Sequence, residues 1–251
     1  MSVIYINPYA FYDTDAQAYI SAVETEDGQG LEDGVKNAIN SFVLGCKADG
    51  IWTAIQESCI LAGARTLTGA LIPLKGSAPT NNGPFVTDDY NRTTGLVGNG
   101  SSKFLSTAKL INTLTGSNSH AAVSWTTLGN AVFYGNTAES RFDVAGANAR
   151  HFYGGGGGGS MPAVISVPGL VGTNRSDGGT TFAVRINKTN LTTTHGLNPF
   201  GAVQPLGIFR GGSGQYSTSR LTFYSMGTSI NLALLDSRVT DMIDAFVASI
   251  P

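Results

Sequence analysis

The chain has 251 residues, of which 41% are hydrophobic and 13% are charged, and its formal net charge at pH 7 is −2. This balance excludes a disordered chain, which combines high charge with few apolar residues, and it leaves enough apolar side chains for a sizeable core. A net charge near zero does not indicate the basic surface that binds nucleic acid. No run approaches the roughly 18 consecutive apolar residues of a membrane span. We therefore expect neither nucleic-acid binding nor membrane insertion.

The charge is distributed unevenly along the chain. Residues 1–84 carry nine acidic and four basic side chains, and residues 227–251 carry three and one. Residues 85–226 carry five acidic and ten basic side chains, which is a net charge of +5. Such a basic segment could be attracted to an anionic cell envelope, although an ordinary solvated surface explains the same excess.

The N-terminal third is predicted to be mainly helical. After a short alternating segment at 3–6, apolar residues recur at helical spacing in three stretches. The first stretch begins at Thr14, the second runs from Leu31 to Cys46, and the third runs from Ile51 to Leu61. A connector at 67–72 and a Pro- and Gly-rich linker at 73–84 follow. Helices this short bury little by themselves, so they need the rest of the chain or other copies of it as a partner.

The first residues and the two cysteines indicate the compartment of synthesis. Residues 1–6 have no basic start and only a short apolar run, so we expect no signal peptide and synthesis in a cytosol. Cys46 and Cys59 both fall in the helical part. In a cytosol-made protein we expect two buried free thiols rather than a disulfide.

Residues 88–105 mark the change from helical to strand periodicity. Gly95, Gly98 and Gly100 fit turn backbone that needs a positive φ or a close approach, and apolar alternation starts at 103–105. The G-L-x-G-x-G run resembles the entry to the first strands of concanavalin A-like (laminin G-like) β-sandwiches.

Short segments with one apolar face then recur, which predicts antiparallel strands wetted on one side. They lie at 123–126, 142–144, 163–167, 182–186 and 220–226. Near the end, a helix is predicted over about 228–249 from an apolar stripe at spacings of three and four. The stripe consists of Leu232, Leu235, Val239, Met242 and Phe246. It could pack on its own domain or form a subunit seam.

Many short strands separated by Gly, Asn, Ser and Thr turns predict a mainly β fold. The expected architecture is a concanavalin A-like jelly-roll sandwich with a small N-terminal helical module and a C-terminal helix. We expect residues 1–84 to form a helical attachment module with its linker, and residues 85–251 to form the sandwich.

The carboxylates give no glycosidase pattern. A retaining glycosidase needs two carboxyl groups about 5–5.5 Å apart, which glucanases of this superfamily place on one strand as E-x-D-x-E or E-x-D-x-x-E. Glu139 and Asp143 would lie roughly 13 Å apart on a strand, and the adjacent Asp88 and Asp89 would point to opposite faces. No G-x-S-x-G elbow marks a serine nucleophile. We therefore expect that the chain is not an enzyme, with an inverting pair from separate strands as the alternative.

Glycan binding requires less: an aromatic platform, some amides or hydroxyls, and in some proteins a calcium ion. The predicted ligand-binding residues are Tyr153, Asn174, Arg175, Asp177 and Tyr216. Further aromatic candidates are Trp125, Tyr134 and Phe152, although an alternating Trp is more often a core residue. Calcium could bind through Asp88, Asp89 or Asp177, without a motif to support it. The glycine run 154–159 has two interpretations: a surface loop without a role in binding, or a loop at the end of the sandwich whose bare backbone lets a ligand approach.

Several short segments of the helical part share a pattern with known proteins. They are Ala18–Ile20, Val23–Glu24, Gly30–Glu32, Val35–Asn40, Gly45–Trp52 and Cys59–Leu67. Together they resemble a module of tailed-phage virion proteins that precedes a laminin G-like domain. Asp89–Arg92, Gly95–Leu96, Phe223–Ser225 and Leu232–Val239 fall where that arrangement places them. Residues 110–215 match in character only, so the resemblance carries no ligand site over to them.

The resemblance implies a phage virion structural protein made in the host cytoplasm, with residues 1–84 docking to other virion proteins or sister subunits. We expect a tail-fibre or baseplate-associated adhesin, as a homotrimer, whose β-domain binds a host-surface glycan and gains from avidity. The alternatives are a capsid decoration or cement protein, a fibre component without a ligand, and a depolymerase acting on capsular polysaccharide.

Overall fold

The computed structural model describes most of the chain, with gaps. The described residues are 12–110, 119–130, 132–136, 141–145, 148–152, 159–161, 167–176, 179–194, 205–212 and 214–251. The strand predicted at 3–6 and most of the one at 163–167 lie outside them.

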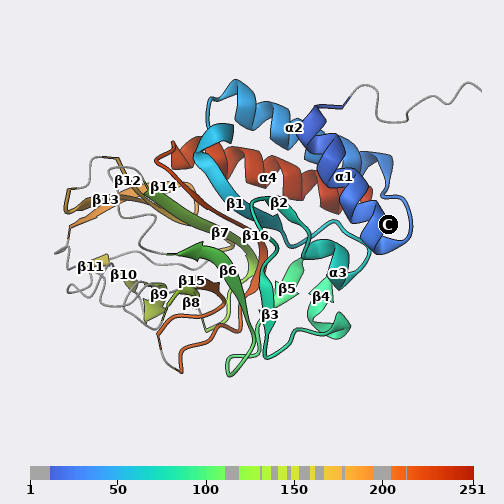
Figure 1. Ribbon diagram of the computed structural model, residues 1–251. Helices are drawn as coiled ribbons and strands as arrows, with labels where there is room; N and C mark the ends of the chain where they lie inside the picture. The colour runs from blue at the N-terminus through green and yellow to red at the C-terminus, as the bar shows by residue number, and fades with distance from the viewer. Residues whose placement is uncertain are drawn as a thin grey trace, which may run out of the picture.

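Two antiparallel β-sheets form the body of the molecule (Figure 1). One consists of β1 Ile55–Ile60, β2 Pro73–Lys75, β4 Tyr90–Asn91, β5 Gly95–Val97, β7 Ser119–Thr127, β12 Gly169–Arg175, β13 Thr181–Ile186, β14 Thr189–Thr194 and β16 Arg220–Gly227. The other consists of β3 Thr80–Asn82, β6 Phe104–Leu110, β8 Val132–Gly135, β9 Arg141–Ala145, β10 Asn148–Phe152, β11 Gly159–Met161 and β15 Pro205–Ile208.

The nine-stranded sheet has the order β14-β13-β12-β7-β16-β1-β2, with β5 on β16 and β4 on β5, and the seven-stranded sheet has the order β11-β10-β9-β8-β15-β6-β3. Their inner faces pack on each other around Trp125, Phe133, Phe142 and Tyr224, each 1% exposed or less. In β7 the alternation sends Val123 and Trp125 into this inner core. The prediction of a mainly β sandwich, with helices near the two ends of the chain, is confirmed.

Three helices cover the outer face of the nine-stranded sheet (Figure 1). They are α1 (Thr14–Asp27), α2 (Asp33–Ala48) and α4 (Leu232–Ser249). Phe42 of α2 packs edge-on against Phe223 of β16, with ring centroids 5.7 Å apart. The stripe predicted for the last helix is buried along its whole length. The sandwich and α4 are therefore the partner that the short N-terminal helices need.

The helix predicted from Ile51 to Leu61 is wrong. A single 3-10 turn, η1 (Trp52–Ala54), leads into β1, which lies between β16 and β2. Cys59 faces the inner core and Ile60 faces the helices, so β1 is buried on both sides. Ile51, Ile55 and Cys59 recur at a helical spacing of four, and periodicity alone does not separate a short strand buried on both faces from a buried helix.

The boundary predicted between residues 84 and 85 does not coincide with a break in the structure. Within the expected connector and linker lie the four-residue helix α3 (Leu67–Ala70), β2 and β3. β1 and β2 belong to the nine-stranded sheet and β3 to the seven-stranded one. Residues before the expected boundary thus contribute strands to both sheets, alongside the helical layer.

The turn that follows η2 (Thr87–Asp89) and β4 has the backbone that its glycines predict. Gly95 has φ +89°, and a Cβ there would lie 2.1 Å from the backbone oxygen of Leu221. A Cβ on Gly98 would lie 2.1 Å from the backbone oxygen of Ser217. The two glycines let the β5 segment approach β16 and the chain that leads into it.

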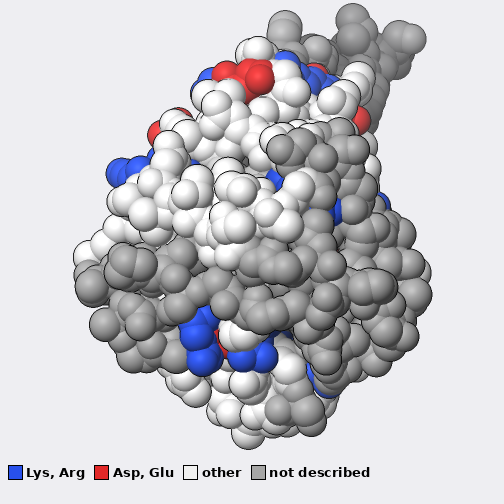
Figure 2. Space-filling model, turned by 90° about the vertical axis from the view of Figure 1, so that its left-hand side faces the viewer, with Lys and Arg blue, Asp and Glu red and all other residues white. Residues whose placement is uncertain are grey.

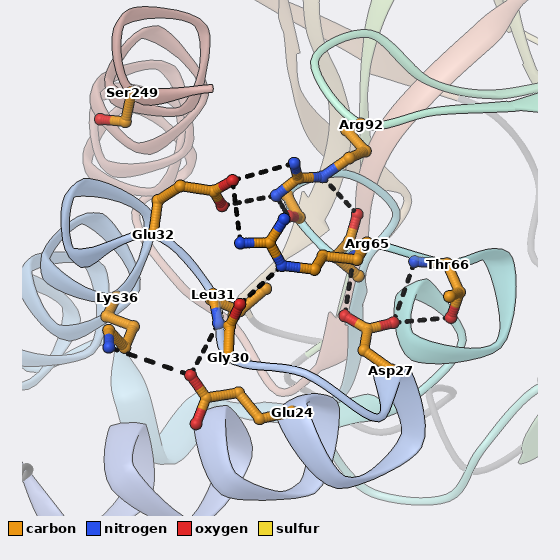
Figure 3. A network of polar contacts seen from close by, with 12 residues as sticks. Glu24, Asp27, Gly30, Leu31, Glu32, Lys36, Arg65, Thr66, Arg92 and Ser249 are labelled. Carbon is orange, nitrogen blue, oxygen red and sulfur yellow. Dashed lines mark hydrogen bonds and ion pairs between the residues drawn. The ribbon is translucent and has the colours of Figure 1, made fainter. Parts of the chain in front are cut away.

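A network of polar contacts joins the helices to the sandwich (Figure 3). The guanidinium of Arg92 donates from Nη1 and Nη2 to the two oxygens of Glu32, at 3.0 and 2.6 Å. Arg65 Nη2 lies 3.1 Å from Glu32 Oε1, and the backbone N–H of Arg65 donates to Asp27. The loops after α1 and β1 and the turn after β4 are held together by these contacts.

Cys46 and Cys59 are free and buried, as the sequence predicts. Burial raises the pKa of Cys46 to about 12, and Cys59 Sγ donates to the backbone oxygen of Ala70. Among the described residues, no helix is both long and apolar enough to cross a membrane.

Candidate functional site

Two of the predicted ligand-binding residues are structural. Asn174 is 8% exposed in β12; its Oδ1 accepts from the Ile230 backbone N–H, and its Nδ2 donates to Ser229 Oγ. Arg175 is 2% exposed, with its guanidinium carbon 5.5 Å from the ring centroid of Phe182. The prediction that Asn174 and Arg175 contact a ligand is therefore corrected, because β12 is an interior strand covered on both faces.

The remaining sequence candidates divide into core, surface and undescribed residues. Trp125 lies in the inner core, as does Tyr134, whose hydroxyl is 2.8 Å from Thr173 Oγ1. Tyr153 and Asp177 lie outside the described residues. Tyr216 is half-buried on the outer face of the seven-stranded sheet, and Phe152 lies on that face too.

The register of the seven-stranded sheet places a row of residues on this outer face. Across the strands, Phe152 pairs with Arg141, Arg141 with Gly135, Gly135 with Gly207, and Gly207 with Ser106. The neighbouring positions of the same strands point into the inner core: Phe142, Tyr134, Ile208 and Leu105. Successive side chains of a strand point to opposite faces, so the row itself faces outward.

One end of the row carries an ion cluster around Asp143, which is 2% exposed. Arg141 Nε donates to Asp143 Oδ2 and Arg150 Nε donates to Oδ1, each at 2.6 Å. The guanidinium carbon of Arg141 lies 3.8 Å from the ring centroid of Phe152. The carboxylate and the ring together fix the plane of the Arg141 guanidinium.

At the middle of the row, the missing side chain of Gly207 makes room for Arg210. A Cβ on Gly207 would lie 3.2 Å from Arg210 Cβ, so Arg210 folds across the sheet at this point. Its guanidinium carbon lies 4.5 Å from the ring centroid of Phe104, and Phe104 and Tyr216 have centroids 6.2 Å apart. Within the described part of the chain, its buried Nε has no hydrogen-bond partner.

We call this surface the arginine face. It comprises Arg141, Arg150, Arg210, Phe104, Phe152 and Tyr216. Figure 2 views the molecule from the side on which β9 to β11 lie, and basic side chains there gather around an acidic one in its lower half. Among the described residues of this face, the three guanidinium groups are accompanied by one carboxylate, Asp143, which leaves a net charge of +2.

Sequence reasoning named Phe152 and Tyr216 but missed the three arginines. The signal for two of them is present: Arg141 and Asp143 alternate on one strand, and Arg150 and Phe152 on the next. Residues two apart on a strand share a face, so each pair could have been assigned to one surface. The meeting of the pairs depends on the register between β9 and β10, which single-strand patterns do not contain.

A cavity of about 300 Å³ lies away from the arginine face, on the helical side of the nine-stranded sheet. Ser124, Thr126, Lys188, Thr240 and Asp244 are among the residues that line it. Of the sequence candidates among the described residues, Trp125 lines it, and Asn174, Arg175 and Tyr216 do not.

Of the three predicted calcium ligands, Asp88 and Asp89 lie within the described residues and Asp177 lies outside them. Asp89 forms an ion pair with Lys103 and accepts from the Val86 backbone N–H. Across the part of the chain that the structure describes, no three His, Cys, Asp or Glu side chains are placed to hold a metal ion.

No family model and no curated protein matches the chain. Solved structures match it at low identity. Trypanosoma rangeli sialidase in complex with sialic acid is 12% identical with a TM-score of 0.45, covering 76% of this chain and 34% of that one. The CBM40 of Ruminococcus gnavus IT-sialidase bound to α2,3-sialyllactose is 11% identical with a TM-score of 0.36, covering 51% and 85%. The chain spans about a third of the length of the sialidase chains that it matches.

These matches assign no activity, ligand or site to the chain, but they contradict one prediction. The expectation that the chain is not an enzyme is wrong as stated, because several matched structures are sialidases, which are enzymes. It depended on the absence of a carboxylate pair on one strand and of a G-x-S-x-G elbow. Sialidases use a tyrosine nucleophile and are an exception to the two-carboxylate pattern. The expectation is therefore withdrawn.

Proposed function

We propose that the chain binds a glycan of a host cell surface through the arginine face. The observation that supports this is the meeting of Phe104, Phe152 and Tyr216 with three arginine side chains on one sheet face. Sugar rings present apolar C–H faces and a rim of hydroxyl groups. Aromatic rings contact the former, and guanidinium N–H groups and the tyrosine hydroxyl bond to the latter.

The arginine face also has the rigidity that weak ligands need. The Arg141 plane is held between Asp143 and Phe152, and Arg210 lies over Phe104. Side chains that are ordered before binding lose less conformational entropy when the ligand arrives. A sheet places them on regular backbone rather than on a loop.

The first test is binding of the fluorescently labelled full chain to a panel of bacterial cells, with and without periodate oxidation of surface glycans. We expect binding that periodate abolishes. Binding that survives oxidation would overturn the proposal. No binding to any strain at micromolar concentration would overturn it as well, and would favour a structural component without a ligand.

The site is tested with the double variant Phe152→Ala/Tyr216→Ala. Each lost aromatic contact is worth about 1 kcal/mol, so we expect binding to weaken by at least about tenfold. The matched control is Tyr12→Ala, which removes a half-buried tyrosine bonded to Asn37 in the helical layer. Equal weakening in both variants would place the ligand elsewhere.

We further propose that the chain belongs to a tailed-phage particle, made in the host cytoplasm, in which it acts as a trimeric adhesin. The support is the sequence pattern of residues 18–67. Because the apolar sides of α1 and α2 are already buried against α4 and the sheet, docking would use their polar outer faces. Light scattering should give three times the chain mass of 26.1 kDa, and mass spectrometry should find the chain in purified particles. A monomeric mass would contradict the trimer, and absence of the chain from purified particles would contradict the assignment to the virion.

A further inference from the structure

We infer that the glycan bound by the arginine face is acidic: a sugar unit that carries a carboxylate, phosphate or sulfate group, held by the outer N–H groups of Arg141 and Arg150 with Arg210 beside them. This inference rests on the proposed function and names its ligand class. Its basis is an excess of positive charge that no acidic side chain of the arginine face balances among the described residues.

A structural ion pair at Asp143 would be complete with one arginine. The structure supplies two, each bonded through Nε to a different carboxylate oxygen at 2.6 Å. The carboxylate is 2% exposed in its side chain, whereas Arg141 and Arg150 keep 21% and 34% of their side-chain surface. Asp143 therefore lies beneath the two guanidinium groups, and one positive charge at the surface is not balanced.

The geometry of the arginines leaves their ends available. When Nε holds Asp143, the edge formed by Nη1 and Nη2 is directed away from that bond, because a guanidinium is a rigid planar fork. Within the described part of the chain, these Nη atoms of Arg141 and Arg150 have no hydrogen-bond partner. Two parallel N–H donors match the two oxygens of a carboxylate, phosphate or sulfate group.

Arg210 adds a second surplus charge. It has no acidic partner among the described residues, and its guanidinium is stacked over Phe104. Arg141 lies nearby: a Cβ on Gly211, the residue after Arg210, would be 3.3 Å from Arg141 Cδ. Partly desolvated positive charges that share one small area attract an anion more strongly than dispersed surface charges do.

The same residues favour a sugar over other anions. Phe104, Phe152 and Tyr216 provide aromatic contacts beside the charges, which a free inorganic anion would not use. A net chain charge of −2 disfavours nucleic acid, whose binding requires many phosphate contacts from a broad basic surface. One acidic group on a sugar ring satisfies both parts of the face.

The test uses the full chain and three matched pairs of immobilised polysaccharides. They are polygalacturonate and its carboxyl-reduced form, phosphomannan and its dephosphorylated form, and dextran sulfate and dextran, with double-stranded DNA as a further probe. We expect the wild-type chain to bind at least one acidic member about tenfold more tightly than its neutral partner, and to lose that preference as salt is raised. The preferred pair identifies which oxyanion is recognised.

Variants then assign the preference to the face. Arg150→Gln leaves the Arg141–Asp143 pair in place and should reduce the acidic preference about tenfold. Arg141→Lys keeps the charge but removes the fork and should also reduce it. The matched control is Arg238→Gln in α4, where Arg238 is 35% exposed and paired with Asp49; it removes one positive charge from the helical layer.

Each remaining outcome overturns the inference in a different way. Equal binding of neutral and acidic members would overturn the acidic ligand while leaving glycan binding intact. An equal loss of preference in Arg238→Gln would show non-specific charge attraction, and equally tight binding of DNA would exclude sugar recognition. No binding to any polysaccharide, together with no binding to cells, would overturn the proposed function itself.

Discussion

Arg185 Nε donates a hydrogen bond of 2.6 Å to Asp236 Oδ2 and so ties β13 of the nine-stranded sheet to α4. Only 11% of the arginine and 3% of the aspartate side chain are exposed. Arg185 Nη1 also donates to Asn190 Oδ1, in the adjacent strand β14. This ion pair lies between the helical layer and the sheet, where most neighbouring contacts are apolar.

Asp236→Ala should destabilise the fold strongly, because it leaves the buried Arg185 charge without its partner. Breaking a buried ion pair costs about 3–5 kcal/mol, which should appear as a lower urea midpoint at unchanged slope. The control is Arg238→Gln, also in α4, which breaks the more exposed pair between Arg238 and Asp49 at the end of α2 and should change stability much less. Equal effects would mean that the Arg185–Asp236 pair is not desolvated.

His120 should make stability depend on pH. It is 2% exposed, its Nδ1 lies 2.7 Å from the Thr228 backbone oxygen, and burial lowers its pKa from 6.5 to about 4. Above pH 6.5 the ring is neutral in both states; as the pH falls towards 4, the unfolded chain takes up a proton that the folded chain excludes. The free energy of unfolding should drop by about 2 kcal/mol between pH 7.5 and 5.0 from this residue.

The His120 contribution is isolated by measuring the same pH difference for His120→Gln. This variant is expected to be less stable at pH 7.5, but its stability should change less between the two pH values. A pH dependence identical to that of the wild type would assign the effect to other groups.

Gly95→Ala and Gly28→Ala separate backbone strain from steric overlap. Gly28 ends α1 with φ +69° and nothing within 4 Å of a Cβ, so its replacement should cost about 1 kcal/mol. Gly95 has φ +89°, and its added Cβ would overlap the Leu221 backbone, so we expect a cost of more than about 2 kcal/mol. Thermal unfolding of both variants measures the difference, and similar values would show that β5 moves aside.

Asn174→Ala should affect stability and not glycan binding. Asn174 fixes the start of the segment before α4 through Ser229 and Ile230, so losing two hydrogen bonds should cost about 2 kcal/mol. The folded variant should bind periodate-sensitive cell glycans as the wild type does. Weakened binding with unchanged stability would restore Asn174 to the ligand site.

Elements with one buried face are predicted well from the sequence. The stripe of α4 and the alternation of β13 show a single apolar side, which periodicity detects. β16 was predicted as a strand too, although the structure buries both of its faces rather than leaving one wetted. β1 was predicted as a helix because the helical layer covers one of its faces and the second sheet the other. That covering arises from segments far away in the sequence.

The candidate site was predictable only in part, for a related reason. Tyr216 and Phe152 are aromatic candidates in the sequence, but their meeting with Arg141 and Arg210 depends on cross-strand register and on how the chain after β15 folds back. The sequence predicts that Asn174 binds a ligand, whereas its partners are Ser229 and Ile230, more than fifty residues later. Polarity indicates that a residue needs partners, not which partners the fold supplies.

The position of β1 between β16 and β2 also sets the order in which the molecule can form during translation. Ile60 pairs with Phe223, 163 residues later in the chain. At about 5–20 residues per second, a ribosome needs roughly 8 to 33 seconds to make that interval. Throughout it, β1 can pair with β2 but has no β16 to pair with, so the edge of β1 that faces β16 stays unpaired until the C-terminal quarter of the chain emerges.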